Sequence, residues 1–281
     1  MNIGILTAGG VCPGVNNVVR SIMLRERNQG NRVVGFSEGF RGLNENLRMT
    51  LTTEMVEEGG PGSVLRMSYD YVDMHRAIKH MNDIDRLYCV CGNESMKSAR
   101  DLAVSDRIHT NIIGIPKTIY NDIPGVQSIG FQTAVQELAR YIDCAHVEAV
   151  TTSSIVFLET PGRNANDLAV HAALARNSKV SAVITPDMPK TDYRRVVEYA
   201  YATRGYAVVI VSEMCDYMTS LSVKPKVITP GYLIRDVEPC VYDSILAERI
   251  VREAFEYARD HRDFIKGAGV VIPFSNYPRI V

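Results

Sequence analysis

Three loops that follow strand-like runs are the first places in this 281-residue chain to look for chemistry. The first, residues 7–14 (TAGGVCPG), precedes a helical pattern that begins near Asn16. Paired glycines such as Gly9 and Gly10 let the backbone approach an anion, and the start of a helix adds unpaired amides and a positive dipole end. The spacing matches neither a Walker A loop nor a dinucleotide fingerprint. A phosphate site and a plain glycine turn therefore explain it equally well.

The other two loops differ in how much they suggest. Residues 92–95 (GNES) precede a helical pattern that starts near Met96, and Asn and Ser are good helix caps, so capping alone would explain them. Residues 116–125 (PKTIYNDIPG) form a loop more polar than a plain connector needs to be. Loops of this kind often carry binding and catalytic residues. We interpret the third loop as functional.

The elements that must position these loops alternate between β-rich runs and helical patterns, which is typical of βαβ units and mainly parallel sheets. We expect strands at residues 3–7, 32–36, 86–91, 111–115, 154–159, 182–185, 207–212, 227–229 and 270–273. We expect the clearest helices at residues 131–148 and 241–259. In open parallel sheets, ligands lie beyond the carboxyl ends of the strands. The three loops lie at such ends.

The predicted fold class is α/β, with two Rossmann-like lobes that each contain a mainly parallel sheet. At about 150 residues per domain, the length suits two lobes. The helix at 131–148 would carry the chain from one sheet to the other, and the last long helix would return it. We therefore expect a larger lobe of residues 1–129 with 245–281 and a smaller lobe of residues 130–244, with ligands in the cleft between them.

Composition excludes several classes of function. Lys and Arg number 31 against 32 Asp and Glu, so no basic field is available for a nucleic acid polymer or an anionic membrane. No apolar run approaches the ~20 residues of a membrane span, and the first residues do not resemble an export signal. Six cysteines and six histidines show no zinc-ligand spacing. We expect a cytoplasmic protein without a structural metal site.

Together with other segments, the three loops resemble the phosphofructokinase family, most closely its pyrophosphate-dependent and plant-type ATP-dependent branch, whose first loop reads GGxCPG. The matching segments are GFSEGFRGL (35–43), GIPKTIYNDIPGVQSIGF (114–131), ETPGRNANDLA (159–169), VIVSE (209–213), PGYLIRDVEPCVYD (230–243) and VIPF (271–274). The resemblance implies a phosphofructokinase-like fold and a glycolytic kinase site for fructose 6-phosphate. It also implies a homo-oligomer, either a dimer or a tetramer.

Two acidic positions of the family pattern are changed in this chain. The first aspartate of the family's TIDND motif is the base for the sugar hydroxyl, and Tyr120 stands at that position. A phenol with a pKa of about 10 is neutral at cell pH, and loss of a general base costs ~10² to 10⁴ in rate. The Mg²⁺-linked aspartate of the GGDxS motif corresponds to Asn93, which lacks the charge that Mg²⁺ prefers. Glu94, which together with Lys117 marks pyrophosphate-type members, is the other candidate metal ligand. Mg²⁺ is expected only if the protein is active.

The resemblance also assigns binding roles, most of them to retained residues; one subunit-crossing arginine of the bacterial pattern is replaced by Ser154. To the donor phosphates it assigns Gly9, Gly10, Gly14, Asn93, Glu94 and Ser95. To the transfer site it assigns Lys117, Thr118, Asp122 and the altered base position Tyr120. To the sugar phosphate it assigns Gly162, Arg163, Glu213, Tyr232 and Arg235. Arginine suits this task because its planar fork binds phosphate through two hydrogen bonds.

The losses fall on phosphoryl transfer and the retained residues on binding. We therefore expect a catalytically impaired phosphofructokinase homologue that binds a phosphorylated sugar or a related small phosphate ligand, in a regulatory or sequestering role. The alternative is an active 6-phosphofructokinase that uses pyrophosphate or ATP, with Glu94 or Asp122 in an altered role. A second alternative is a non-catalytic assembly subunit.

Overall fold

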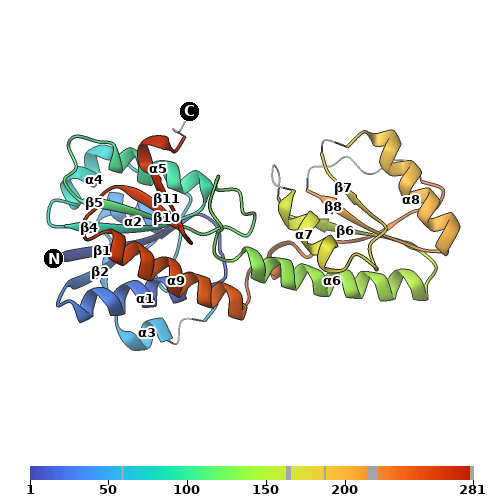
Figure 1. Cartoon of the computed structure of the whole chain (residues 1–281), viewed down its shortest axis with the longest axis horizontal. Coiled ribbons are helices and arrows are strands. Elements are labelled where there is room, and N and C mark those ends of the chain that lie inside the picture. The colour runs from blue at the N-terminus through green and yellow to red at the C-terminus, as the bar shows by residue number, and fades with distance from the viewer. Residues whose placement is uncertain (58–59, 163–165, 187, 214–220, 279–281) are drawn as a thin grey trace. The chain divides into compact units, whose positions relative to one another are not determined.

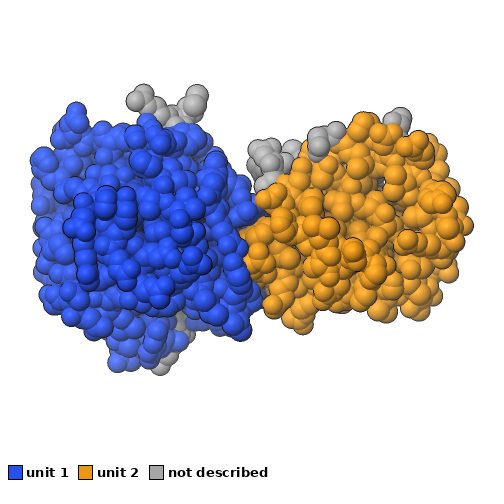
Figure 2. All heavy atoms as spheres, viewed as in Figure 1, with its two compact units in different colours: residues 1–130, 235–281 blue, residues 131–234 orange. Residues whose placement is uncertain are grey.

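The chain folds into two compact α/β units, which Figure 2 shows in different colours. The computed structural model describes residues 1–57, 60–162, 166–186, 188–213 and 221–278. Unit 1 comprises residues 1–130 and 235–281, and unit 2 comprises residues 131–234. Each unit contains one mainly parallel sheet with helices packed on it (Figure 1).

Unit 1 is built on a seven-stranded sheet in the order β11-β10-β5-β4-β1-β2-β3. Its strands are β1 (Asn2–Ala8), β2 (Arg32–Phe36), β3 (Arg48–Thr50), β4 (Arg86–Cys91), β5 (Asn111–Pro116), β10 (Phe264–Gly267) and β11 (Val270–Pro273). The five inner strands are parallel, and only the edge strands β3 and β11 run antiparallel to their neighbours. The central strands β4 and β5 are buried along their whole length, as near-continuous apolar runs covered on both faces should be.

Helices cover both faces of this sheet (Figure 1). They are α1 (Val15–Asn28), α2 (Gly39–Glu45), α3 (Thr53–Glu57), α4 (Met74–His80), α5 (Asn93–Ala103) and α9 (Val241–Tyr257), with a short 3-10 turn η2 (Phe274–Asn276). Helices α1 and α9 pack together on one face. On the other face, α2, α4 and α5 contribute apolar side chains to one large core with the strands.

Unit 2 is smaller and contains a four-stranded parallel sheet in the order β7-β8-β6-β9. Its strands are β6 (Ile155–Thr160), β7 (Ala182–Ile184), β8 (Ala207–Ser212) and β9 (Lys226–Ile228). Its helices are α6 (Phe131–Thr151), α7 (Asp167–Ala175), α8 (Lys190–Arg204) and the 3-10 turn η1 (Gly231–Ile234). Helix α6 begins where the sequence predicted the chain to leave the first unit.

The structure corrects the predicted organisation in two respects. Strands β3 and β10 lie outside the expected strands, because β3 (RMT) has a single apolar residue and Lys266 interrupts the apolar run of β10 (FIKG). The return to unit 1 comes at Arg235 rather than at residue 245. The reason is packing: the whole of α9 belongs with α1, and Arg235 itself lines a pocket of unit 1.

Candidate functional site

The carboxyl ends of β1, β4 and β5 lie side by side in unit 1. Their register pairs Ala8 with Cys91 and Cys91 with Pro116, so the three loops that follow these strands leave the same edge of the sheet. These loops enclose a pocket of about 200 Å³. It is lined by residues 9–12, 92–95, 117–120 and 122, joined by Tyr69 and Arg235. The structure thus brings the three loops together at one site.

Two glycines of the first loop leave the pocket free of side chains from that loop. Gly9 has a φ of +91°, and a Cβ there would lie 3.2 Å from Ser95 Oγ and 3.3 Å from Lys117 Nζ. At Gly10 a Cβ would lie 2.7 Å from the hydroxyl oxygen of Tyr69 and 3.1 Å from Arg235 Nη1. Side chains at these positions would occupy the space that a ligand needs. A plain turn would not require Gly10, so the geometry favours the binding interpretation of this loop.

Lys117 supplies a buried positive charge to the pocket. Its side chain is only 2% exposed, and its ammonium group donates to the carbonyl oxygen of Gly10. Among the described residues, no carboxylate lies within ion-pair distance of its Nζ. Burial lowers the pKa of Lys117 below its usual 10.5. Asp122 acts on this ammonium from beyond ion-pair distance, so an anion bound in the pocket would supply a closer counter-charge.

Asp122 is the pocket carboxylate that accepts hydrogen bonds from other pocket residues. Its Oδ1 accepts a hydrogen bond from Thr118 Oγ1 at 2.8 Å. The side-chain nitrogen of Asn93 donates to the carbonyl oxygen of Asp122 at 3.1 Å and to its Oδ2 at 3.4 Å. Tyr277 in turn donates its hydroxyl to Asn93 Oδ1. A chain of hydrogen bonds thus runs from the C-terminal segment into the pocket.

The second loop is part of a helix, which corrects its predicted role. Helix α5 starts at Asn93 rather than near Met96, its N-cap is Gly92, and no side chain caps it. Capping by Asn93 or Ser95 is therefore the wrong explanation for this motif. Glu94 lies in the first turn, its side chain 64% exposed and paired with Lys97 at 3.0 Å. No group of three or more His, Cys, Asp or Glu side chains suited to a metal ion occurs in the described ranges.

Tyr120 lines the pocket at the altered base position. Its backbone nitrogen donates to Thr118 Oγ1 at 3.1 Å, which fixes the loop between Thr118 and Asp122. Cys12 also lines the pocket, and its thiol donates to the carbonyl oxygen of Ile129 at 3.1 Å. Burial raises the pKa of Cys12 to about 12, so its sulfur is a neutral thiol and not a nucleophile.

The residues predicted for the sugar phosphate are divided between the two units. In unit 2, β6 and β8 end side by side, and Glu213 Oε2 accepts a hydrogen bond from the backbone nitrogen of Gly162 at 3.0 Å. Tyr232 is exposed on η1. Arg235 instead lines the unit 1 pocket, and Arg163 lies outside the described residues.

Sequence reasoning missed Tyr277, which contacts the site. Tyr277 lies 184 positions after Asn93 in the chain, and no motif links the two. Tyr69 is exposed on a loop, and its hydroxyl comes close to Gly10. Over the described part of the chain, no helix is both long and apolar enough to cross a membrane.

Comparison with known proteins gives consistent matches along the chain. A family model described as Phosphofructokinase matches residues 2–258. An ATP-dependent 6-phosphofructokinase of Hamiltonella defensa is 30% identical over 277 residues, covering 90% of this chain and 83% of that protein. Its counterpart from Yersinia pestis is 28% identical over 284 residues, covering 94% and 86%.

Solved structures match the fold of both units. Pyrophosphate-dependent phosphofructokinases from Nitrosospira multiformis and Marinobacter aquaeolei give TM-scores of 0.89 and 0.87 at 18% and 19% sequence identity. The matches cover 99% and 100% of this chain, and 84% and 85% of those chains. The predicted class, α/β with two Rossmann-like lobes and mainly parallel sheets, is confirmed.

Proposed function

Since this chain belongs to the phosphofructokinase family, we propose that its unit 1 pocket binds phosphate-bearing ligands and transfers phosphoryl groups only weakly. The observation that carries the binding proposal is Lys117, a buried ammonium with no described carboxylate in ion-pair distance, inside a glycine-lined pocket. A site of this kind suits a regulatory or sequestering protein, because binding survives where turnover is slow.

Two cationic groups flank Gly10 in this proposal. Lys117 donates to the Gly10 carbonyl oxygen, and Arg235 Nη1 lies 3.1 Å from where a Gly10 Cβ would be. A phosphate near Gly10 would accept charge-assisted hydrogen bonds from both, which are roughly twice as strong as neutral ones. Binding would also offset the cost of burying the ammonium of Lys117.

Weak transfer follows from the proton that the sugar hydroxyl must lose. Tyr120 at the base position is a phenol, and Asp122 already accepts hydrogen bonds from Thr118 and Asn93 on its two oxygens. A general base contributes ~10² to 10⁴ in rate. We expect a deficit of that order relative to a variant that has a carboxylate at position 120.

The second candidate is an active 6-phosphofructokinase, and the names of the relatives favour it. Proteins called ATP-dependent 6-phosphofructokinases match at 28% and 30% identity over more than four fifths of their length. In this candidate Asp122 would give up a hydrogen bond and accept the hydroxyl proton. This candidate leaves two donors to test, because two of the matching solved structures are named pyrophosphate-dependent.

Other features of the proposal rest on the family. Gly162, Glu213 and Tyr232 of unit 2 would bind the sugar phosphate, and the protein would act as a cytoplasmic homo-oligomer, either a dimer or a tetramer. A non-catalytic assembly subunit remains the third candidate. It requires no phosphate ligand, so a protein that binds none would support it.

Turnover with fructose 6-phosphate, Mg²⁺ and either ATP or pyrophosphate separates the first two candidates. We expect the combined Tyr120→Asp and Asn93→Asp changes to raise the rate at least about 100-fold. Tyr199→Asp on the exposed surface of α8 is the matched control and should change nothing. Robust turnover by the unaltered protein, not raised by the double change, would support the active enzyme instead.

A further inference from the structure

Phosphoryl transfer in this family uses Mg²⁺, but the residues of this pocket do not fit the ion. Of the described residues that line the pocket, Asp122 and Glu94 are the acidic ones. Glu94 is mostly exposed and pairs with Lys97. Asp122 faces an O–H donor on one oxygen and an N–H donor on the other. These donors occupy one lone-pair site on each of the two carboxylate oxygens, so a cation would have to compete with them for Asp122.

The orientation of the Asn93 amide follows from its partners. The carbonyl oxygen and the carboxylate of Asp122 can only accept hydrogen bonds, so the NH₂ group of Asn93 must face them. Asn93 Oδ1 is then turned toward Tyr277, whose hydroxyl donates to it and to the Asn93 carbonyl oxygen. Tyr277 is packed in the main core of unit 1, and burial raises its pKa, so the hydroxyl stays a donor.

We propose that the Asn93 amide, held by Tyr277, takes the place of a metal ion beside Asp122, so that the pocket binds phosphate-bearing anions without Mg²⁺. This inference rests on the proposed function and specifies its ligand. The amide satisfies Asp122 and Lys117 supplies the positive charge. The ligand is then a metal-free phosphate, pyrophosphate or phosphosugar rather than a Mg²⁺-chelated nucleotide. Tyr277 acts as a positioning residue.

Calorimetric titration of the full chain with pyrophosphate, once in EDTA and once in excess Mg²⁺, tests this inference. We expect the apparent affinity to be at least as high in EDTA, because Mg²⁺ complexes pyrophosphate and lowers the free anion. Binding about tenfold tighter in Mg²⁺ would overturn the inference but leave the proposed function standing. Absence of binding in both buffers would overturn the two together.

The Asn93→Asp variant should turn the pocket into a metal-dependent one. The added negative charge should weaken pyrophosphate binding in EDTA by about tenfold, and Mg²⁺ should restore it. Asn82→Asp, an exposed change of the same charge, is the control and should leave both affinities unchanged. Equal losses in EDTA and in Mg²⁺ for Asn93→Asp would contradict the inference.

The Tyr277→Phe variant tests the positioning role through a ratio. Without the hydroxyl the Asn93 amide can turn, so the ratio of affinity in Mg²⁺ to affinity in EDTA should rise several-fold. A purely structural role for Tyr277 would lower both affinities and leave that ratio unchanged, which would overturn the positioning role. Tyr206→Phe in unit 2 is the matched control, and melting temperatures verify that each variant folds.

Discussion

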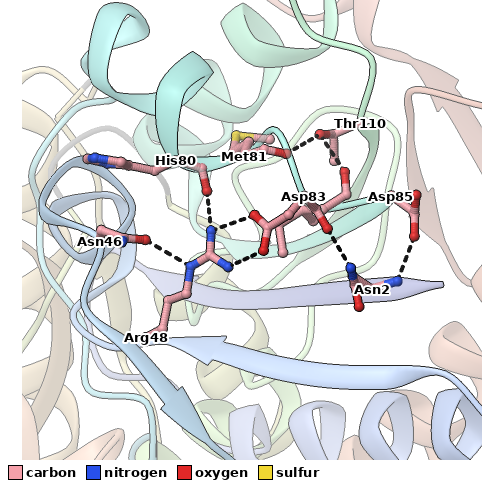
Figure 3. Close-up of polar contacts among 9 residues, drawn as sticks. Asn2, Asn46, Arg48, His80, Met81, Asp83, Asp85 and Thr110 are labelled. Carbon is pink, nitrogen blue, oxygen red and sulfur yellow. Dashed lines mark hydrogen bonds and ion pairs between the residues drawn. The ribbon is translucent and has the colours of Figure 1, made fainter.

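Two polar clusters of unit 1 differ in whether their basic residue has an ion-pair partner among the described residues. In the first, around Arg48, the guanidinium binds Asp83 through Nη1 to Oδ2 at 2.6 Å and Nη2 to Oδ1 at 2.7 Å (Figure 3). Its Nε donates to Asn46 Oδ1 at 2.8 Å, and Nη2 also donates to the carbonyl oxygen of His80. In the second, the pocket, Lys117 has the carbonyl oxygen of Gly10 as its hydrogen-bond acceptor.

The pKa shifts express this difference. The hydrogen bond between Arg48 and Asp83 raises the pKa of Arg48 and lowers that of Asp83, so each charged form is stabilised by a partner within the chain. Burial shifts the pKa of Lys117 in the direction that disfavours its charge. Where the fold completes the ion pair, the residues hold the structure together. Where it does not, as at Lys117, we propose that a ligand supplies the counter-charge.

The Arg48 cluster also shows what completed pairs do for the fold. Asn2 donates through its side chain to the carbonyl oxygen of Asp83 at 2.8 Å, and through its backbone to Asp85 Oδ2 at 2.6 Å. The cluster thereby ties β1 and β3 to the segment between α4 and β4 (Figure 3). Its arginine already has a bidentate carboxylate partner, so we assign the cluster to stability and not to binding.

The largest expected effect in this comparison is at Gly10, where a side chain would fill the pocket. Gly10→Val should weaken pyrophosphate binding by about 100-fold, because its Cβ would lie 2.7 Å from the hydroxyl of Tyr69 and 3.1 Å from Arg235 Nη1. Gly10→Ala should show a smaller loss in the same titration. Because Tyr69 is exposed and can move, the melting temperature should change little. Unchanged binding by Gly10→Val would place the ligand elsewhere.

The next effect is the pH dependence of binding. In the proposed site the charged form of Lys117 would bind the anion. Because its pKa lies below 10.5, affinity should fall as pH rises through that lowered pKa. The decline should therefore begin at a lower pH than for an exposed lysine and reach about tenfold. Lys117→Arg, which stays charged, should remove the decline in an otherwise identical titration series. A wild-type affinity that is flat up to pH 10.5 would count against Lys117 as the binding cation.

The smallest effect is expected in the Arg48 cluster. Asp83→Asn should lower the free energy of unfolding by about 0.5–1 kcal/mol, a modest value because the Asp83 side chain is 57% exposed. Because the pKa of Asp83 is lowered from 3.8, this contribution is present above pH 3.8 and is lost as pH falls through the lowered pKa. Denaturant unfolding at neutral and acidic pH measures it. Loss of pyrophosphate binding in this variant would break the distinction between the two clusters.

Much of the architecture around the pocket could be predicted because it depends on local pattern. Strands β1, β4 and β5 are apolar runs followed by loops, and parallel pairing places those loops at one edge. Strand β10 could not be predicted, because Lys266 interrupts its apolar pattern. In the structure this lysine is buried and pairs with Glu253 at 2.7 Å. Only the tertiary partner makes a charged residue compatible with a strand buried along its length.

The details of the site depended on contacts that no local pattern encodes. Asn93 matches a capping residue by type, but it bonds to Asp122, and Gly92 is the cap. Tyr277 reaches Asn93 from 184 positions away. The resemblance assigns Arg235 to the sugar phosphate, and the fold shows what the sequence could not, that this residue lies beside Gly10 in unit 1. Residue types were enough to identify the loops of the site, whereas the hydrogen bonds within it depend on tertiary structure.

The measurement that tests the central claim most directly is pyrophosphate titration of Lys117→Met beside the wild-type chain, together with the melting temperature of each. We predict that Lys117→Met loses about 100-fold in affinity while its melting temperature stays equal or rises, because a buried ammonium without a described ion-pair partner is removed. Retained affinity with a lowered melting temperature would show that Lys117, like Arg48, serves the fold, and would contradict the account.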